Sequence, residues 1–286
     1  MVISYLGRGI AHELAGEPCQ DALGQRICGD GTIVMALSDG AGSARWAGEA
    51  ARAITAAVTE FFCGTALSEL TALPAEQIGT MLLESCRNVL RTIQEARQEP
   101  DIRQFSATVV FAAVSQTQIL VGNLGDGMAA VLDDCGGTLL ELGPEAGPMG
   151  GNSTWFVISP GAQQHLRIGV LDRSVDRPEL LVLTSDGLRD LLWSRGDGDP
   201  LKTVRELWDL VRSGDLDGDD ALADILNQMA ELTDERMDDW SMLLWCAKGE
   251  TADREWSPVC RSMLREEEEK YGIPASTEPR PGDVSK

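Results

Sequence analysis

Basic residues are scarce in this chain of 286 residues. It has 24 Lys and Arg against 46 Asp and Glu, which gives a formal net charge of −22. Nucleic-acid grooves and proteins that bind anionic membranes use clustered Lys and Arg, so we expect neither partner. Hard cations and basic protein surfaces are compatible with this charge.

Cysteines are few and show no pairing pattern. The chain has seven, an odd number, and no two stand in a C-x-x-C pair: Cys19, Cys28, Cys63, Cys86, Cys135, Cys246 and Cys260. This usage is typical of a reduced cytosol, and it predicts neither a disulfide scaffold nor a zinc site.

Long hydrophobic runs are also missing. The first residues, M-V-I-S-Y-L-G-R-G-I-A-H-E, contain no apolar segment of signal-peptide length. No run elsewhere approaches the ~20 residues that a membrane span needs. We therefore expect a soluble, cytoplasmic protein.

What the chain does have is three apolar segments that each end in Asp-Gly. The acids are Asp39, after I-V-M-A-L-S, Asp126, after L-V-G-N-L-G, and Asp186, after L-L-V-L-T-S. Short apolar runs bounded by turn residues indicate buried strands. One Asp-Gly is weak evidence, because turns favour both residues. Three such strand ends together predict converging carboxylates.

The remaining hydrophobic pattern alternates between strands and amphipathic helices. Strands are expected at 2–10, 22–27, 32–37, 106–114, 118–124, 128–133, 154–158, 180–184 and 241–247, and helices at 44–62, 74–98, 188–193, 203–211 and 222–232. Residues 12–21 and 139–151 read as loops. Short turns within 106–133 predict an antiparallel meander.

The pattern indicates one large domain over residues 1–250. Beyond Lys248 the periodicity fails, and a charged run, R-E-E-E-E-K, precedes a segment rich in Pro and Ser. We expect residues 251–286 to form an acidic, flexible tail.

Two further acids belong with the three strand ends. Asp21 ends a loop and Asp238 precedes the last strand, so both can reach the same sheet edge. Packed carboxylates repel one another unless a cation neutralises them. Oxygen ligands without a His or Cys cluster select Mg²⁺ or Mn²⁺. A pair of such ions activates water for in-line displacement at phosphorus, so these acids predict hydrolysis of a phosphate ester.

Six motifs in this order resemble the protein phosphatase 2C family of metal-dependent serine/threonine phosphatases. They are Q-D-A from Gln20, S-D-G-A-G-S from Ser38, S-A-T-V-V from Ser106, N-L-G-D-G from Asn123, T-S-D-G-L-R-D-L-L from Thr184 and D-D-W-S-M-L-L-W from Asp238. The resemblance spans about residues 5–247. The segment G-I-A-H-E-L-A-G-E-P-C-Q-D-A is similar to the divergent bacterial branch.

The resemblance implies an α+β fold, a four-layer α-β-β-α sandwich of two mainly antiparallel sheets flanked by helices. It also implies two Mn²⁺ or Mg²⁺ ions at one end. By position, Asp39 would bridge both ions, the Gly40 carbonyl would bind one, Asp186 and Asp238 would hold the other, Asp126 would bind a weaker third ion, and Asp21 would act through metal water.

The reaction implied by the resemblance is direct attack of a metal-bridging hydroxide on phosphoserine or phosphothreonine, without a phosphoenzyme. Asp39, Asp186 and Asp238 would then be catalytic through metal-bound water. The implied partners are phosphorylated proteins, including a bacterial Ser/Thr kinase or its substrates.

Three positions depart from the family pattern. Gln20 stands where the family usually has Glu, and Ala41 stands where eukaryotic members have a histidine. The arginine that often binds substrate phosphate has no clear match, and Arg8 and His12 are the nearest candidates. The alternatives to an active phosphatase are a pseudophosphatase that binds a partner through the same fold and a metal-binding regulatory module.

Overall fold

The computed structural model describes residues 1–145, 147, 153–193, 199–233 and 238–247. These residues all fall in the first of two units, Met1–Thr251. The second unit, Ala252–Lys286, lies outside the described residues, so the predicted flexibility of the tail stays a prediction.

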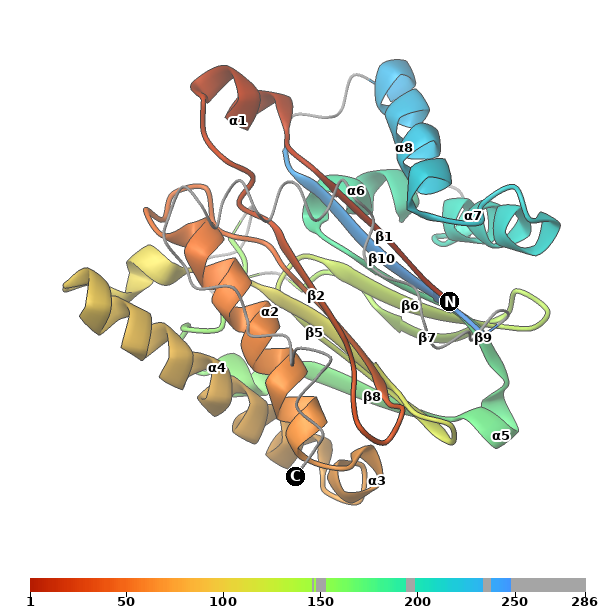
Figure 1. Ribbon diagram of the computed structural model, residues 1–286, viewed down its shortest axis with the longest axis horizontal. Helices are drawn as coiled ribbons and strands as arrows, with labels where there is room; N and C mark the ends of the chain where they lie inside the picture. Colours follow the sequence, from red (N-terminus) through yellow and green to blue (C-terminus); the bar gives the residue numbers. More distant parts are fainter. Residues whose placement is uncertain (146, 148–152, 194–198, 234–237, 248–286) are drawn as a thin grey trace, which may run out of the picture. The chain divides into compact units, whose positions relative to one another are not determined.

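The described strands form two five-stranded antiparallel sheets (Figure 1). The first has the order β1 (Val2–Gly7), β10 (Trp240–Cys246), β9 (Pro178–Thr184), β6 (Met128–Asp133) and β7 (Thr138–Leu142). The second has the order β2 (Ala22–Ile27), β3 (Ile33–Ser38), β4 (Val109–Val114), β5 (Gln118–Leu124) and β8 (Arg167–Asp172).

Helices cover the outer face of each sheet. The second sheet is covered by α2 (Ala47–Gly64) and α4 (Ala75–Arg97), and the first by α6 (Asp186–Leu192), α7 (Lys202–Ser213) and α8 (Asp219–Thr233). Short helical segments connect the layers: α1 (Ile10–Ala15), α3 (Leu67–Leu70), η1 (Ile102–Phe105), η2 (Ala162–Gln164) and α5 (Arg173–Asp176). The predicted α+β sandwich of two antiparallel sheets flanked by helices is confirmed.

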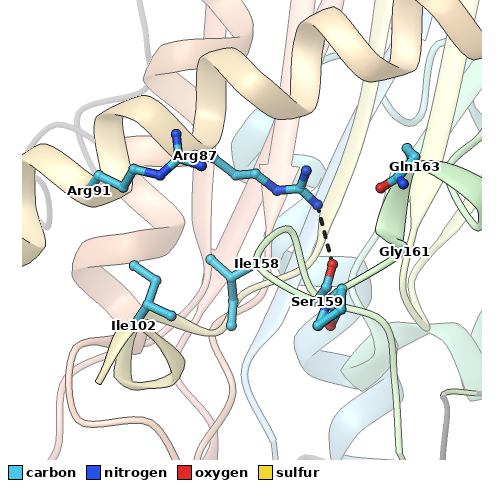
Figure 2. A pocket seen from close by; sticks show the side chains of 8 residues that line it. Arg87, Arg91, Ile102, Ile158, Ser159, Gly161 and Gln163 are labelled. Atoms are coloured by element: carbon cyan, nitrogen blue, oxygen red, sulfur yellow. Dashed lines mark hydrogen bonds between the residues drawn. The ribbon is translucent and has the colours of Figure 1, made fainter. Parts of the chain in front are cut away.

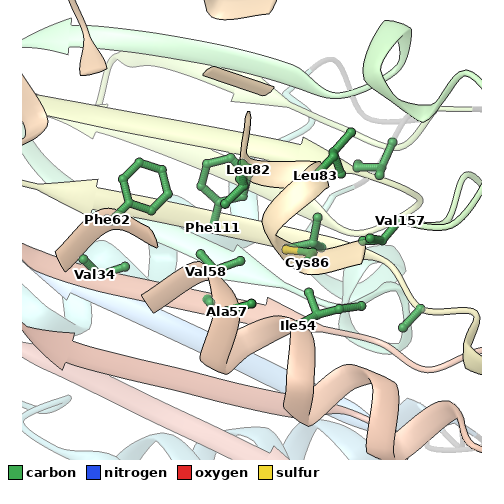
Figure 3. Close-up of a cluster of buried hydrophobic side chains, with 14 of the residues drawn as sticks. Val34, Ile54, Ala57, Val58, Phe62, Leu82, Leu83, Cys86, Phe111 and Val157 are labelled. Carbon is green, nitrogen blue, oxygen red and sulfur yellow. The ribbon is translucent and has the colours of Figure 1, made fainter. Parts of the chain in front are cut away.

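Apolar side chains fill the three interfaces between the layers of this sandwich. Phe111 packs on Phe62 beneath α2 and α4, with ring centroids 5.5 Å apart (Figure 3). A second cluster lies under the helices of the first sheet. Alternate residues of the strands, such as Leu37 and Leu243, are fully buried and belong to neither cluster, which places them between the sheets. Because both faces of the central strands are covered, their sequences are mostly apolar and do not alternate with polar residues.

The predicted meander over 106–133 is wrong. β4 and β5 pair as a hairpin, but β6 pairs with β9 and β7 in the other sheet. The chain crosses between sheets at Gly125-Asp126-Gly127, where Gly125 has φ +121°. A short connection rich in glycine serves a hairpin and a corner between sheets equally well, so the sequence pattern does not distinguish them.

Several element predictions also differ from the structure. The segment 154–158 is not a strand, because Val157 packs into the core under α4 instead of joining a sheet. The strands β7 and β8 were missed, since both lie at sheet edges and carry polar residues among their apolar ones. The first predicted strand stops at Gly7, and part of the predicted 12–21 loop is helical as α1.

Cys28 and Cys63 form a disulfide that joins the end of β2 to the last turn of α2. The expectation of unpaired thiols is therefore wrong for this pair. The two residues are 35 positions apart in the sequence, and only the packing of the β2–β3 hairpin under α2 brings them together.

The expected cytoplasmic location stays a prediction. Among the described residues, no helix is both long and apolar enough to cross a bilayer.

Candidate metal centre

Three carboxylates meet at one end of the sandwich. Asp39 follows β3, Asp126 lies in the β5–β6 crossing, and Asp186 begins α6 directly after β9. One carboxylate oxygen of each lies within 4.8 Å of the others. Three strand ends from two sheets therefore deliver the cluster.

Asp21 and Asp238 lie beside these three acids. The charges of both raise the pKa of Asp39, which places their carboxylates close to it. Asp21 is buried just before β2, and Ser241 Oγ donates a 2.6 Å hydrogen bond to its Oδ2. Asp238 is exposed just before β10. The structure thus brings together all five acids singled out in the sequence, and their role as metal ligands stays a prediction.

Burial and mutual repulsion raise the carboxyl pKa values across the cluster. For Asp186, burial and then the charges of Asp126 and Asp238 raise the pKa from 3.8 to about 6. The pKa of Asp39 lies well above its usual range, mainly through burial and then through the charge of Asp21. Burial also raises the pKa values of Asp21 and Asp126. Without a counter-ion, this site holds its negative charge at a cost in stability.

Backbone contacts fix the Asp39 turn. The amide of Asp39 donates to Thr108 Oγ1 at 3.1 Å, and the Thr108 amide donates to the Asp39 carbonyl at 2.8 Å. Gly40 forms a bridge with Ala107. A Cβ on Gly40 would lie 2.7 Å from the carbonyl carbon of Ala47, so only glycine lets the turn approach α2 this closely.

Asp239 supports the site through hydrogen bonds to backbone amides. The sequence analysis did not single out this residue. Its buried carboxylate accepts hydrogen bonds of 2.7 Å from the amides of Gly9 and Gln20. His12 Nδ1 lies 2.9 Å from Asp239 Oδ1. Asp239 therefore ties the segment that carries Asp21 to the start of β10. The only signal in the sequence was the doubled acid of the D-D-W-S motif.

The guanidinium of Arg189 is the second feature that the sequence reading missed. This residue lies on α6, and its Nη1 donates to the Asp126 carbonyl at 3.2 Å. Its charge lowers the pKa values of both Asp126 and Asp186, so it lies close to the acids. Of the two predicted phosphate-binding residues, Arg8 donates to the Glu17 carbonyl, and His12 lies within 4.8 Å of Asp238 and Asp239. Their role in binding phosphate stays a prediction.

The donor set fits divalent cations that prefer oxygen. The cluster is made of carboxylates, and Asp126 Oδ1 is buried with no hydrogen-bond partner among the described residues. The side-chain oxygen of Gln20, next to Asp21, is also buried and has no hydrogen-bond partner within the described part of the chain. Buried oxygens without a hydrogen bond are rare and suit a cation. Oxygen ligands of this kind favour Mg²⁺ or Mn²⁺.

Comparison with solved structures shows the same fold in bacterial phosphatases. The structure of the serine/threonine phosphatase Stp1 from Staphylococcus aureus has a TM-score of 0.58 at 17% identity, with 87% of this chain and 95% of that chain covered. A variant of a bacterial serine phosphatase has a TM-score of 0.60 at 17% identity, covering 88% and 99%. The catalytic domain of the serine/threonine phosphatase PstP, solved with two manganese ions, has a TM-score of 0.57 at 15% identity, covering 85% and 96%.

No curated protein matches the chain significantly by sequence. Comparison with family models gives a specific result. The family model of protein phosphatase 2C matches residues 8–227, which is most of the described part of the chain. The chain belongs to the protein phosphatase 2C family.

Proposed function

We propose that this protein is a metal-dependent phosphatase of phosphoserine and phosphothreonine in proteins. The observation that carries the proposal is the convergence of Asp39, Asp126 and Asp186 within 4.8 Å, with the charges of Asp21 and Asp238 close by. Such a concentration of buried negative charge is costly without cations and is typical of sites that use them for phosphoryl chemistry. A two-manganese structure of a family relative supports the same reading.

In this proposal the metal ligands are those implied by the family resemblance. Asp39 and the carbonyl of Gly40 would hold one Mn²⁺ or Mg²⁺ ion, and Asp39, Asp186 and Asp238 the second. Asp126 would hold a weaker third ion, and Asp21 would act through metal water. Bound divalent ions would lower the pKa of water and stabilise negative charge on the phosphoryl oxygens.

The protein's own groups position this chemistry. Asp239 fixes the backbone at Gln20, which keeps Asp21 in place behind the cluster. The Ser241 hydroxyl orients the Asp21 carboxylate by donating to it. Arg189 lies beside Asp126 and Asp186. Its guanidinium would donate charge-assisted hydrogen bonds to the phosphate monoester of the substrate.

The activity is tested with purified wild-type protein. We expect hydrolysis of p-nitrophenyl phosphate and of a phosphothreonine peptide that depends on added Mn²⁺ or Mg²⁺ and stops with excess EDTA. No turnover across a range of both metals would overturn the proposal. The result would then favour the pseudophosphatase alternative, for which Gln20 in the usual Glu position is the specific observation.

Arg189 is expected to bind the substrate phosphate. In Arg189→Lys, the guanidinium fork is lost while the charge is kept, so we expect KM for p-nitrophenyl phosphate to rise about tenfold, because a bidentate contact to phosphate is lost. We expect kcat to change less than KM. Steady-state kinetics measures both constants, and thermal melting checks the fold. The same change at exposed Arg26 is the control. An unchanged KM in Arg189→Lys would exclude this role.

A further inference from the structure

A cavity of about 390 Å³ lies on the outer side of the second sheet, between α4, η1 and the segment 158–163. Figure 2 shows Arg87 and Arg91 projecting from α4 on one side, with Ile102 and Ile158 below them and Gln163 on the far wall. None of these residues belongs to the candidate metal centre. The function proposed above therefore leaves this cavity without a role.

The cavity has the opposite charge to the chain as a whole. Its lining residues include two arginines and no acid, although the chain has a net charge of −22. The two guanidiniums come from positions four residues apart on α4, so they lie on the same helix face. An anionic group is the ligand that such a pair attracts.

Hydrogen bonds hold both arginine heads in place. Arg87 Nε donates to the Val157 carbonyl at 2.9 Å and its Nη2 to the Ser159 carbonyl at 3.3 Å. Arg91 Nη1 donates to Glu84 Oε1 at 2.9 Å, and both of these side chains are about half exposed. Glu84 offsets part of the charge of Arg91 outside the cavity. Arg87 donates only to carbonyls in these contacts, and the charge of Glu84, whose pKa both arginines lower, is shared between the two guanidiniums.

The segment that lines the cavity also runs past the metal centre. The carbonyl oxygen of Trp155, the residue after Thr154, would lie 3.3 Å from a Cβ on Gly125, the neighbour of Asp126, and Ser159 lines the cavity. Between them, the Val157 amide donates to the carbonyl of Ala107, the residue that bridges Gly40. An extended residue spans at most ~3.6 Å, so the Cα atoms of Thr154 and Ser159 are at most about 18 Å apart. The turn at 156–159, where the Ser159 amide donates to the Phe156 carbonyl, shortens this span, so an extended peptide of at most five residues covers it.

We propose that this cavity binds an acidic side chain of the phosphoprotein substrate, at most about five residues from the phosphorylated residue. The inference rests on the proposed phosphatase activity. The carboxylate of a substrate Asp or Glu pairs with Arg87 and Arg91, and the apolar part of the neighbouring peptide packs on Ile102 and Ile158. The cavity is larger than a lone small anion requires, which favours a peptide segment as its occupant.

The test uses two phosphothreonine peptides that differ only in the charge of flanking residues. One carries Glu at the positions three to five residues before and after the phosphothreonine, and the other carries Gln at the same positions. We expect wild type to have a kcat/KM about fivefold higher for the Glu peptide, the size expected of a partly exposed charge pair. The preference should weaken at high salt. Arg91→Gln should lower the ratio, and the double change Arg87→Gln with Arg91→Gln should bring it close to one, while Arg26→Gln, at an exposed position on β2, should leave it unchanged.

Two further measurements separate the cavity from the activity. Hydrolysis of p-nitrophenyl phosphate should be equal in wild type and Arg91→Gln, because this substrate does not reach the cavity. Fluorescence anisotropy should show that the unphosphorylated Glu peptide binds wild type more tightly than Arg91→Gln. If wild type turns over no substrate, the proposed function fails, and anisotropy alone decides on the cavity. Equal binding of the Glu and Gln peptides by wild type, or binding of citrate without binding of the peptide, would overturn this inference.

Discussion

Asp39→Asn is expected to abolish Mn²⁺-dependent hydrolysis of p-nitrophenyl phosphate and to stabilise the metal-free protein. Asp39 is the acid on which the charges of the other four converge. Loss of a residue that only supports a metal ligand costs about 10–100-fold in activity. Loss of the proposed bridging ligand should therefore cost more than ~100-fold.

The expected gain in stability follows from the same electrostatics. Burial and the charges of the other four acids raise the pKa of Asp39, so its ionised form is unfavourable in the metal-free fold. The neutral amide removes this repulsion, and we expect the free energy of unfolding in EDTA to rise by about 1 kcal/mol or more. Activity and urea denaturation measure the two effects on one preparation.

The matched control for this experiment is Asp134→Asn. Asp134 is an exposed acid in the turn after β6, at the opposite end of that strand from Asp126. The same loss of charge there should change neither activity nor stability in EDTA. If Asp39→Asn keeps substantial turnover, the assignment of the bridging ligand is wrong. If it loses activity and is also destabilised in EDTA, the repulsion argument fails.

The acids could be predicted from the sequence because each lies at the end of a buried, mostly apolar strand. β3, β5 and β9 are covered on both faces, so each is mostly apolar in sequence. Asp39, Asp126 and Asp186 lie at the ends of these strands, next to the apolar core. Burying a carboxylate without a partner costs free energy, so acids at these positions stand out in the sequence. A local pattern therefore carried most of the information about the candidate site.

The parts that could not be predicted depend on contacts between distant residues. Asp239 reaches the amides of Gly9 and Gln20 across sequence separations of 230 and 219 residues, and no local pattern reports such contacts. The Cys28–Cys63 disulfide has the same character. The assignment of β6 to the opposite sheet also depended on its distant partner β9, since the crossing at Gly125 resembles an ordinary hairpin turn.

The metal-free protein is expected to become less stable as the pH rises from 5.5 to 7.5, and Mn²⁺ should reverse this loss. The pKa of Asp186 is raised from 3.8 to about 6 in the folded protein. Between these two values the folded state binds more protons than the unfolded state, so the free energy of unfolding falls as the pH rises through this window. For this one carboxyl the full difference is on the order of 3 kcal/mol, most of it below pH 5.5, so roughly 1 kcal/mol is lost between pH 5.5 and 7.5. The raised pKa values of Asp21, Asp39 and Asp126 act in the same direction.

Urea denaturation in EDTA at pH 5.5, 6.5 and 7.5 measures this dependence, and the same series with Mn²⁺ measures its reversal. Asp186→Asn isolates the contribution of this carboxyl, because an amide does not titrate, so its unfolding free energy should vary less with pH than that of wild type. Asp134→Asn, at the exposed turn, should keep the wild-type dependence. Cations bind the ionised acids, so stabilisation by Mn²⁺ should be greatest at pH 7.5 and smallest at pH 5.5. A metal-free protein whose stability rises with pH over this range would contradict the buried repulsion on which the candidate metal centre rests.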